Sequence, residues 1–338
     1  MVRHIGRLHK FGIGIQTAPG VEKTPDFWIP LLEGSSFQDK PEYKDNEGGY
    51  GNTVGISDTQ IGFNKADGDM NGKIQLRSVG AEMTLLHGQA PTSVQRTTTG
   101  VFDHTWDMLT STNATKLATL SKEEPNFSGK HKDVGINTWS LDTELGDFIK
   151  RTMNLMGGPE YSTTAATPAY IDDIEFMTDH MNVRLAAEGA NDATIEAATP
   201  IKITGFGLNF NKNVELTQEY GSKDPSSASS KVIAIDGSIE AFYDDRMYYT
   251  LARANGNKGT SQAMRVSIKD ANLIIGTSGS HNPEIRFTLS NIKFQLPEKT
   301  PDNNELVKQT IPFKAYVSMI DGKLLTTRVT NAYAGTAY

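Results

Sequence analysis

The stretch DTQIGFNKADGDMNGKIQLRSVGAEMTLLHG, residues 58–88, predicts a strand, a tight turn, a second strand and a short helix closed by glycine. The turn is expected at DGDMNG, residues 67–72, because Asp, Asn and Gly favour turn conformations. The same order of elements is expected in SKVIAIDGSIEAFYDDRMYYTLARANG, residues 230–256. A supersecondary unit that occurs twice indicates a duplicated architecture.

The helix of each unit is predicted from its ends and its apolar face. Ser78 is the candidate N-cap of the first helix and Gly88 is its stop. Asp244 and Gly256 take these roles in the second helix. The apolar positions share helical spacing and are Val79, Met83 and Leu86 in the first unit, and Met247, Tyr248 and Leu251 in the second.

Matched positions recur in the same order in both halves of the chain, and the offset between them changes only at expected loops. The matched pairs are His9 and His180, Glu42 and Glu215, Gly72 and Gly237, Gly88 and Gly256, and Lys150 and Lys308. The predicted division is a first domain at 1–158, a linker at 159–170, a second domain at 171–320 and a C-terminal tail at 321–338. The linker is placed by its Gly, Pro, Ser and Thr content.

The composition indicates a soluble globular protein rich in strands and turns. The 338 residues suffice for one large domain or two ordinary ones. A net charge of −7 argues against a protein that holds nucleic acid by neutralising phosphates. The chain has no cysteine, which excludes disulfides and thiolate metal sites. No stretch has the apolar run of a signal peptide or a membrane span, so folding is expected in the cytoplasm.

The segment GFGLNFNKNVELTQEYG, residues 205–221, alternates apolar and polar residues and predicts a half-buried strand or a bent pair of strands. Its apolar side is formed by Leu208, Phe210, Val214 and Leu216. The acidic residues that share the polar side of such strands are Glu42, Glu215, Glu219, Asp236 and Glu240. An ordinary solvated face explains them, and so does a weakly anionic surface along which another molecule slides.

The sequence contains one candidate metal site. DGDMNGKI, residues 67–74, matches the first eight positions of a calcium-binding EF-hand loop, but Ser78 stands where the loop needs a bidentate Glu. A turn between two strands explains the same residues and is favoured, because the second unit keeps AIDGSI and loses the acids. No nucleophile elbow, phosphate-binding loop or dinucleotide fingerprint occurs. No catalytic, cofactor or metal site is predicted, and no enzyme.

Several short motifs resemble the tail tube (major tail) proteins of long-tailed, non-contractile bacteriophages. They are G-x-G-x-x-T-x-x-G at residues 12–20, FWIP at 27–30 and F-x-x-x-P-x-Y at 37–43. A strand, a glycine, a second strand and a short helix ending in HG follow them. In the second half, FGLNFNKNVELTQEYGSKDP followed by IDGSIEAFYDD resembles the same family. The resemblance spans nearly the whole chain.

The resemblance implies a mainly β protein with two tandem tail-tube domains, each a β-sandwich or half-barrel with a short flanking helix. Such domains form rings whose inner sheets merge into a barrel around a lumen, and the rings stack into a tube for genome ejection. Two domains per chain suggest a homotrimeric ring with pseudo-sixfold symmetry, with a homohexamer as the alternative. The expected lumen-facing residues are Gln38, Glu42, Gln75, Asn211, Asn213, Glu215, Glu219, Asp236 and Glu240.

The resemblance also implies partners. These are further copies of the chain, the tape measure, tail terminator and tail tip proteins, and double-stranded DNA in transient, non-specific passage, with no membrane and no cofactor. The expected location is the virion tail, assembled in the cytoplasm of the bacterial host. The loop at 45–55 and the tail from Thr326 are expected to become ordered on contact with a neighbouring ring.

Two other classes compete with this interpretation. A carbohydrate-binding or adhesive β-sandwich needs aromatic residues clustered on one exposed face, whereas Trp28, Trp106 and Trp139 are spread among expected strands. A hydrolase needs convergent acid, base or nucleophile residues, and none can be assembled from the sequence. A contractile-tail tube or a baseplate ring would share the same domain.

Overall fold

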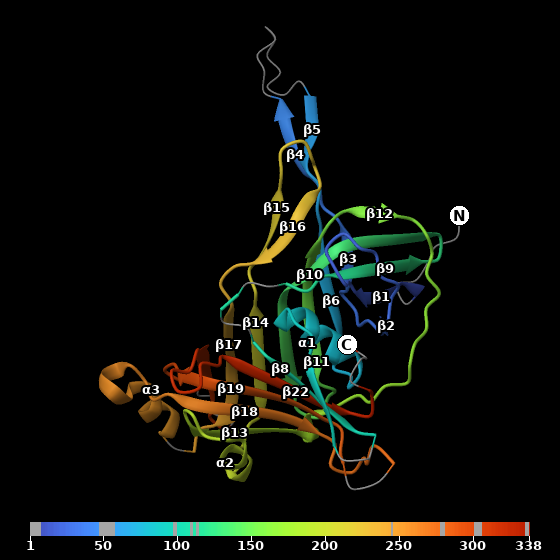
Figure 1. Cartoon of the computed structure of the whole chain (residues 1–338). Coiled ribbons are helices and arrows are strands. Elements are labelled where there is room, and N and C mark those ends of the chain that lie inside the picture. Colours follow the sequence, from blue (N-terminus) through green and yellow to red (C-terminus); the bar gives the residue numbers. More distant parts are fainter. Residues whose placement is uncertain are drawn as a thin grey trace.

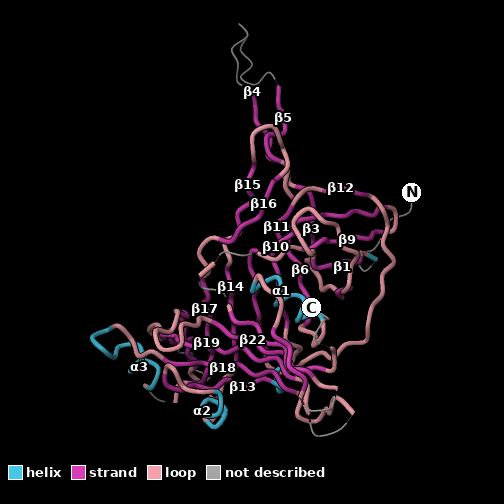
Figure 2. Tube along the Cα trace, in the orientation of Figure 1, coloured by secondary structure: helices cyan, strands magenta, loops and turns pink. Residues whose placement is uncertain are grey.

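The structure is a computed structural model that describes residues 8–46, 58–96, 100–108, 111–112, 115–244, 246–277, 281–300, 306–334 and 338. It is mainly β, as predicted: strands dominate, and the described helices are short (Figure 2). All the strand pairs described below are antiparallel. One large sheet closes into a barrel, and two hairpins stand apart from it (Figure 1).

Eight strands lie side by side in what we call the long sheet. Their order is β3 (Ser36–Asp39), β6 (Ala66–Lys73), β11 (Lys150–Gly157), β10 (Phe127–Glu144), β14 (Gly205–Asn211), β17 (Ala234–Phe242), β21 (Lys308–Tyr316) and β20 (Glu298–Thr300). β10 and β14 pair over seven residues, from Thr138 opposite Asn211 to Glu144 opposite Gly205. This pair joins the two halves of the chain in one sheet.

Two further groups of strands continue from the long sheet. The first group is β2 (Phe27–Ile29), β1 (Lys10–Ile15), β9 (Ala118–Glu124), the N-terminal part of β10 and β12 (Glu160–Ser162). The second group is β13 (Met181–Ala187), β18 (Gln262–Lys269), β19 (Glu284–Phe294), β22 (Leu325–Asn331), β8 (Phe102–Asp107) and β7 (Thr92–Gln95). β10 runs through both the first group and the long sheet, and β19 also pairs with β21.

The order of strand pairing repeats between the halves. In the N-terminal half, β3 pairs with β6, β6 with β11 and β11 with β10. In the C-terminal half, β14 pairs with β17, β17 with β21 and β21 with β20. β9 lies between β1 and β10, as β18 lies between β13 and β19. Residues 295–297 separate β19 from β20, and both strands lie against β21.

Two hairpins extend beyond the long sheet at the top of Figure 1. They are β4 (Glu42–Asn46) with β5 (Asp58–Phe63), and β15 (Val214–Gln218) with β16 (Pro225–Ser230). Gln218 Nε2 donates to the Gly62 carbonyl at 2.8 Å, and the Asn64 N–H donates to the Lys223 carbonyl at 2.8 Å. The hairpins therefore support each other. Asp45 and Asn46 of the predicted loop belong to β4, and residues 47–55 lie outside the described residues.

Helix α1 (Ser78–His87) lies in the protein core, and all of its residues are buried. Gly88 ends it in the left-handed conformation, φ 74°, which confirms the predicted stop. The predicted N-cap is wrong: Ser78 lies inside the helix, and no side chain at the N-cap position bonds the first turn. The Asp173 carboxylate accepts from the backbone N–H groups of Arg77 (2.9 Å) and Ser78 (3.3 Å) instead. A residue 95 positions away in the sequence therefore caps this helix.

The two other α-helices among the described residues are short and lie on the outside. α2 (Asp192–Ala197) is capped by Asn191, whose side chain accepts from the Thr194 N–H at 2.8 Å. In α3 (Met247–Asn257) the N-cap position is Arg246, whose side chain makes no capping bond, so the predicted position of the cap at Asp244 is wrong. The backbone of α3 leaves helical geometry at residues 254–256. Only part of the predicted stripe is buried, because Tyr248 packs inward whereas Met247 is 41% exposed.

The predicted turn at 67–72 is also wrong, and with it the basis for a calcium loop. These residues form the middle of β6, where Asp67, Asp69 and Asn71 point away from the core and Gly68, Met70 and Gly72 point towards it. The glycines are needed for close packing. A Cβ on Gly68 would lie 1.9 Å from the Ser36 carbonyl oxygen, and one on Gly72 would lie 2.9 Å from the Arg151 guanidinium. Because glycines occupy two of the inward positions of β6, its sequence does not show the usual alternation of apolar and polar side chains.

The sequence INTWSLDTELGDFIKRTMNLMGG, residues 136–158, predicts two strands around a turn near Gly146. The structure confirms both strands, because β10 ends at Glu144 and β11 begins at Lys150. Gly146 has φ 80° in the turn. The C-terminal region differs from its prediction as a free tail. Residues 325–331 form β22, which pairs with β19 on one side and β8 on the other. Val329 is fully buried there, so this segment is part of the core and is ordered without a neighbouring chain.

Candidate functional site

The outward face of the long sheet carries a row of small polar side chains. Asn71, Thr152, Ser140 and Asn209 stand opposite one another across β6, β11, β10 and β14, and the row continues to Asp236 and Lys314. A neighbouring row aligns Asp69, Asn154, Thr138 and Asn211. Period-two alternation places these residues outside, because the residues between them fill the core. We call this surface the polar face.

Side chains on the polar face bond to one another across the strands. Thr152 Oγ1 donates to Asn71 Oδ1 at 2.8 Å, and Asn154 Nδ2 donates to Asp69 Oδ1 at 2.8 Å. Such cross-strand pairs hold side chains in place on a sheet. The central part of the face therefore presents fixed, mostly uncharged hydrogen-bonding groups.

Charges on this face gather towards the β10–β11 turn. Lys150 Nζ lies 2.5 Å from Asp147 Oδ2, and Lys73 Nζ lies 2.6 Å from Glu175 Oε2. The hydrogen bond from Lys150 lowers the pKa of Asp147, and the same contact raises the pKa of Lys150. Both groups are therefore charged at neutral pH and largely compensate each other.

Four of the nine predicted lumen residues lie on the polar face or at its margin. Asn211 and Asp236 belong to its central rows, opposite Thr138 and Asn209. Glu240 is exposed on β17, and Gln38 is exposed on the short strand β3. The outward residues of β10 and β11 were not among the predicted residues, although NTWSLDTE and KRTMNLMG alternate in the same way.

Four of the remaining predictions fall on or beside the hairpins. Glu42 lies in β4 and Glu215 in β15, while Asn213 and Glu219 stand at the two ends of β15. Asn213 has φ 48°, a conformation that Asn tolerates, at the bend between β14 and β15. Gln75 lies elsewhere: it follows β6, bridges to Glu175, and its side chain is 7% exposed.

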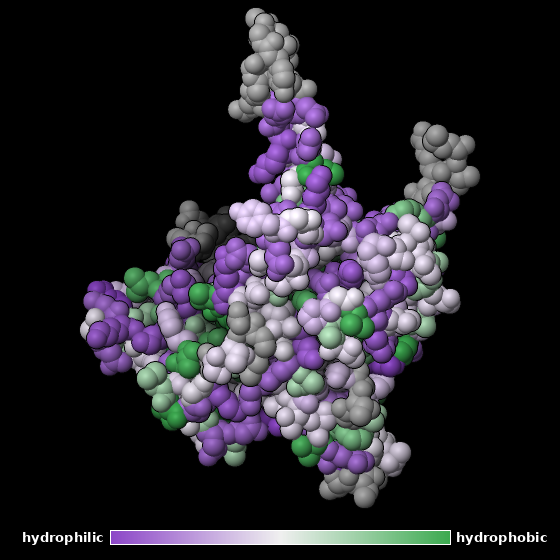
Figure 3. Space-filling model, turned by 45° about the horizontal axis from the view of Figure 1, so that its top comes forward, coloured by the Kyte–Doolittle hydropathy of each residue, from purple (hydrophilic) through white to green (hydrophobic). Residues whose placement is uncertain are grey.

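An open groove of about 480 Å³ lies between the bases of the two hairpins. Ion pairs mark its walls: Lys65 Nζ to Glu42 Oε1 at 2.7 Å, and Lys231 Nζ to Glu215 Oε2 at 2.7 Å. Above the groove the β4–β5 hairpin has a mostly hydrophilic surface (Figure 3). Every residue of β4 is exposed. The hairpin is joined to β15–β16 near its base, at Gly62 and Asn64, and is exposed beyond that point.

Beneath the polar face, an ionic cluster fixes α1 against the sheet. Arg151 Nε lies 2.8 Å from Glu82 Oε1, and Trp139 Nε1 donates to Glu82 Oε2 at 2.9 Å. Arg151 also donates to the Met70 carbonyl at 2.9 Å. All of these side chains are almost completely buried. The cluster joins three neighbouring strands of the long sheet, β6, β11 and β10, to one helix.

The C-terminal end of α1 is held by a residue of the second half. Lys212, just after β14, donates from Nζ to the Leu85 carbonyl at 3.0 Å. Burial lowers the pKa of Lys212 to about 8. The last residue of the helix, His87, lies 2.9 Å from Thr327 Oγ1 and is 3% exposed. Burial lowers the pKa of His87 to about 3, so its ring is neutral in the folded protein at pH 7.

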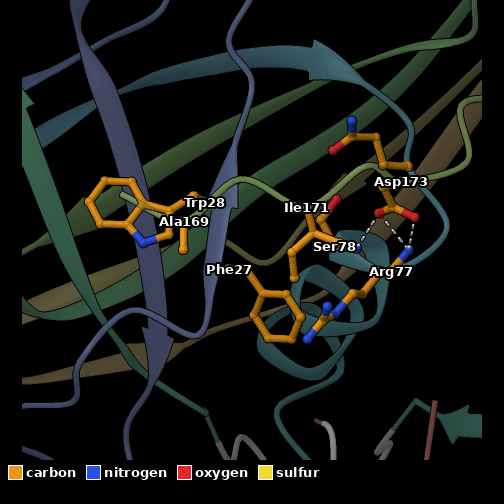
Figure 4. Close-up of a pocket in the computed structure, with 8 residues that line it drawn as sticks. Phe27, Trp28, Arg77, Ser78, Ala169, Ile171 and Asp173 are labelled. Atoms are coloured by element: carbon orange, nitrogen blue, oxygen red, sulfur yellow. Dashed lines mark hydrogen bonds between the residues drawn. The ribbon is translucent and has the colours of Figure 1, made fainter. Parts of the chain in front are cut away.

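A small hollow lies beside the N-terminal end of α1 (Figure 4). Phe27, Trp28, Ala169 and Ile171 line it together with Asp173, whose bonds to Arg77 and Ser78 are drawn there. Burial raises the pKa of Asp173, against the backbone N–H donors that lower it. The volume of about 20 Å³ is close to the space for one water, so the hollow does not form a substrate site.

The described residues offer little support for the competing classes. Trp106 and Trp139 are fully buried and Trp28 is 7% exposed, so none provides an exposed platform for a sugar ring. Within the described ranges, no three His, Asp or Glu side chains come together as metal ligands. No helix in this part of the chain is long and apolar enough to cross a membrane.

The chain was compared with known proteins. No curated protein matches it. A family model described as phage tail tube protein matches residues 6–315. The matched region runs from before β1 to the last residues of β21, so it contains all eight strands of the long sheet, both hairpins and the buried helix α1.

Proposed function

Because the chain belongs to the phage tail tube protein family, we propose that it assembles into rings that stack into a conduit for genome ejection. Membership makes the chain a structural component of the virion tail. The proposal assigns it no catalytic step and no cofactor. The observation that carries the proposal is the polar face, a continuous sheet surface of small, mostly uncharged hydrogen-bonding groups.

The polar face has the properties that a DNA-conducting lumen needs. Tight binding of DNA requires clustered Lys and Arg that neutralise phosphates. The central rows carry mainly Asn, Thr and Ser instead, with Asp69 and Asp236 among them and a single exposed lysine, Lys314, at the end of one row. Lys73 and Lys150, at one end of the face, are paired with carboxylates. A duplex would therefore pass this surface without being held.

The strand order suggests how one copy meets the next. The long sheet consists of two series of four strands: β3, β6, β11 and β10 form the first, and β14, β17, β21 and β20 form the second. The two series meet where β10 pairs with β14. The equivalent positions at the ends of the long sheet are β20 and β3. Among the described strands, β3 pairs with β6 and β20 with β21, each on one side. Pairing β20 of one copy with β3 of the next would repeat the β10–β14 contact and cover both edges.

The register of this contact follows from the internal pair. Asp142 of β10 stands opposite Lys150, and Thr300 of β20 stands opposite Lys308 in the same way, so Asp142 and Thr300 are equivalent. Two residues earlier in these strands, Ser140 is equivalent to Glu298. In β3, Gln38 lies two residues after the residue that faces Asp69. In β14, Asn209 lies two residues after the residue that faces Ser238, so Gln38 and Asn209 are equivalent. Since Ser140 pairs with Asn209, Glu298 is expected opposite Gln38 of the neighbouring copy.

Two series of four strands per chain favour a ring of three copies with pseudo-sixfold symmetry, with six copies as the alternative. The exposed hairpins are the proposed contacts between stacked rings. Tape measure, terminator and tip proteins are the proposed partners inside the tube and at its ends, and assembly is assigned to the host cytoplasm. The preference for a non-contractile tail rests on the sequence motifs alone.

The cysteine-free chain permits a direct test of the ring. Opposite residues of antiparallel strands have Cα atoms about 4.5–5.5 Å apart, within disulfide range. Gln38→Cys combined with Glu298→Cys should give oxidised dimers and trimers on a non-reducing gel. Electron microscopy should show rings or hollow tubes wide enough for duplex DNA.

The matched control combines Gln38→Cys with Leu296→Cys, which shifts one partner by two residues and should cross-link poorly. A ladder that ends at six copies would replace the trimer with a hexamer. A monomer at high concentration, with no cross-links in either variant, would remove the ring proposal altogether.

A further inference from the structure

Helix α3 is the counterpart, in the second half of the chain, of the buried helix α1. β6 and β17 hold the second place in the two series of the long sheet, and each helix begins five residues after its strand ends. The N-cap position is an arginine in both helices, Arg77 and Arg246. Counting from these arginines, Thr84 of α1 is equivalent to Arg253 of α3. The repeat of the strands therefore extends to the helices.

The two helices differ in how much of their surface is covered. Every residue of α1 is buried, whereas Tyr248 is the one buried residue of α3. Tyr248 packs against Phe294 of β19, with the ring centroids 5.3 Å apart, and more than half of the residues of α3 are exposed. α3 lies at the left-hand end of the molecule in Figure 1. Its outer side has no cover from the described part of its own chain.

Two segments of the second half cover the last turn of α1. Lys212, directly after β14, donates to the Leu85 carbonyl at 3.0 Å, and Thr327 Oγ1 of β22 lies 2.9 Å from His87 Nε2. The first half contains counterparts of both segments. β3 starts the first series as β14 starts the second, and β12 pairs with β10 as β22 pairs with β19. By the repeat, the end of β3 and strand β12 are the segments expected to cover the last turn of α3.

A single chain does not bring these segments to α3, because β3 and β12 lie on the right of Figure 1 and α3 lies on the left. In the proposed ring, β20 of one copy pairs with β3 of the next. That pairing places β3 and β12 of the next copy beside α3, as β14 and β22 lie beside α1 within the chain. The occupant expected at α3 is therefore a second copy of this chain.

The end of β3 and strand β12 together present two carboxylates. Asp39 is the last residue of β3, Glu160 is the first of β12, and the Glu160 N–H donates to Asp39 Oδ1 at 3.1 Å. Among the described residues, neither carboxylate forms an ion pair with Lys or Arg. His131 Nδ1 lies 3.6 Å from Asp39 Oδ1, but burial lowers the pKa of His131, so its ring is largely uncharged at pH 7. Burial and the nearby Asp39 charge raise the pKa of Glu160, as expected for an acid beside another acid.

Arg253 is the matching cation on α3. Its side chain is exposed, with Nη1 donating to the Tyr249 hydroxyl at 2.7 Å and Nε donating to Asn257 Oδ1 at 3.3 Å. It forms no ion pair with a described residue. In α1, the equivalent Thr84 is covered by Trp106 of β8, but only four residues separate α3 from β18, too few for such a strand. The space beside Arg253 is therefore open to a neighbouring copy.

We propose that the last turn of α3 is a contact between neighbouring copies of the chain, in which Arg253 of one copy pairs with Asp39 and Glu160 of the next. The inference rests on the proposed ring. Asp39 follows Gln38 in β3, and successive side chains of a strand point to opposite faces. The contact therefore lies on the core side of the β20–β3 pair, away from the lumen. Opposite charges at this point also help to fix the orientation in which two copies join.

A carbodiimide, which joins amines to carboxylates, tests the contact directly. Arg253→Lys places an amine at the end of α3. Isotope-labelled and unlabelled chains of this variant are mixed before assembly, and the cross-linked peptides are identified by mass spectrometry. Position 253 should be joined to Asp39 or Glu160, with one peptide labelled and the other unlabelled. Adding Asp39→Asn/Glu160→Gln to the variant should remove this product. Rings that yield no such product would overturn the proposal.

A charge exchange tests the pair by its effect on assembly, in the Gln38→Cys/Glu298→Cys background. Arg253→Glu and Asp39→Lys should each lower the yield of cross-linked oligomers about tenfold, because like charges then face each other. Combining the two substitutions should restore most of the yield. Lys223→Glu makes the same change in net charge as Arg253→Glu, in the turn between β15 and β16, and should cross-link like the parent.

Thermal unfolding checks that each variant is folded, and Asp39→Asn/Glu160→Gln replaces Asp39→Lys if the latter is not. Unchanged yields in both single reversals would overturn the contact at α3 while leaving the ring in place. A parent chain that forms neither disulfide-linked oligomers nor rings would remove the ring and this contact together.

Discussion

Arg151 Nε donates to Glu82 Oε1 at 2.8 Å, and neither side chain is exposed by more than 2%. Arg151 belongs to β11 of the long sheet and Glu82 to the buried helix α1. Trp139 of β10 donates to the other oxygen of the same carboxylate. The pair therefore fixes the position of the strands that carry the centre of the polar face.

Removing one member of this pair should be more harmful than replacing both. Glu82→Ala leaves the Arg151 guanidinium and the Trp139 N–H without their acceptor in the core, and should lower the free energy of unfolding by about 3–5 kcal/mol. The double variant Glu82→Met/Arg151→Met should recover part of this loss. Urea denaturation measures both. A loss below about 1 kcal/mol for Glu82→Ala would contradict the assigned role.

Asp173 should stabilise α1 from outside the helix. Asp173→Ala removes the acceptor for the Arg77 and Ser78 N–H groups and should cost about 0.5–2 kcal/mol, as for other lost N-caps. The neighbouring, exposed Asp172→Ala has the same change in charge and serves as the control. Equal stability of the two variants in thermal unfolding would show that the cap contributes nothing.

His87 should make the fold sensitive to acid. Its folded pKa of about 3 lies below the ordinary value of 6.5, so the unfolded chain binds the proton first as pH falls. Stability from this residue is therefore complete above pH 6.5 and is lost between pH 6.5 and pH 3. The difference amounts to about 2 kcal/mol between pH 7 and pH 5.

His87→Gln is the matching variant, because Gln is neutral across this range and can bond Thr327. Urea denaturation at pH 7 and pH 5 should show a smaller loss of stability on acidification in the variant than in the parent chain. An identical loss in both proteins would show that His87 does not carry the effect.

Gly68 should tolerate no side chain. A Cβ there would lie 1.9 Å from the Ser36 carbonyl oxygen, so Gly68→Ala must displace β3 from β6 at a cost of about 1–3 kcal/mol. Gly207→Ala on β14 is the control, because its Cβ would make an ordinary contact of 3.4 Å with Ser238 Oγ. Since β3 is the proposed edge, Gly68→Ala should also reduce the Gln38–Glu298 cross-link. Unchanged cross-linking and stability would contradict this packing.

Local sequence patterns predicted those elements whose causes are local. The alternation at 205–211 gives β14, the glycine at 146 gives the β10–β11 turn, and Gly88 ends α1 in the left-handed conformation. Each of these depends on the residue's own conformation or on the next few side chains. The family resemblance was likewise visible in short motifs, and it agrees with the family match.

The predictions that were wrong concern features that depend on contacts between segments distant in the sequence. The composition of DGDMNG is typical of a turn, but its glycines are needed because Ser36 and Arg151 pack closely against them. These two residues lie 32 or more positions away in the sequence. The cap of α1 comes from Asp173, and the polar C-terminal segment is buried because β8 and β19 flank it. The polar face itself required the register of β10 with β11 and β14, which no single strand reveals.

Strand β10 runs for 18 residues, first beside β9 and then between β11 and β14. A pull along this strand acts on all of its flanking hydrogen bonds at once, in shear, so they share the load instead of opening one after another. The two halves of the chain should therefore respond to force as a single stiff body. In the proposed tube of stacked rings, bending would then occur between successive rings, and the bore of each ring would stay round.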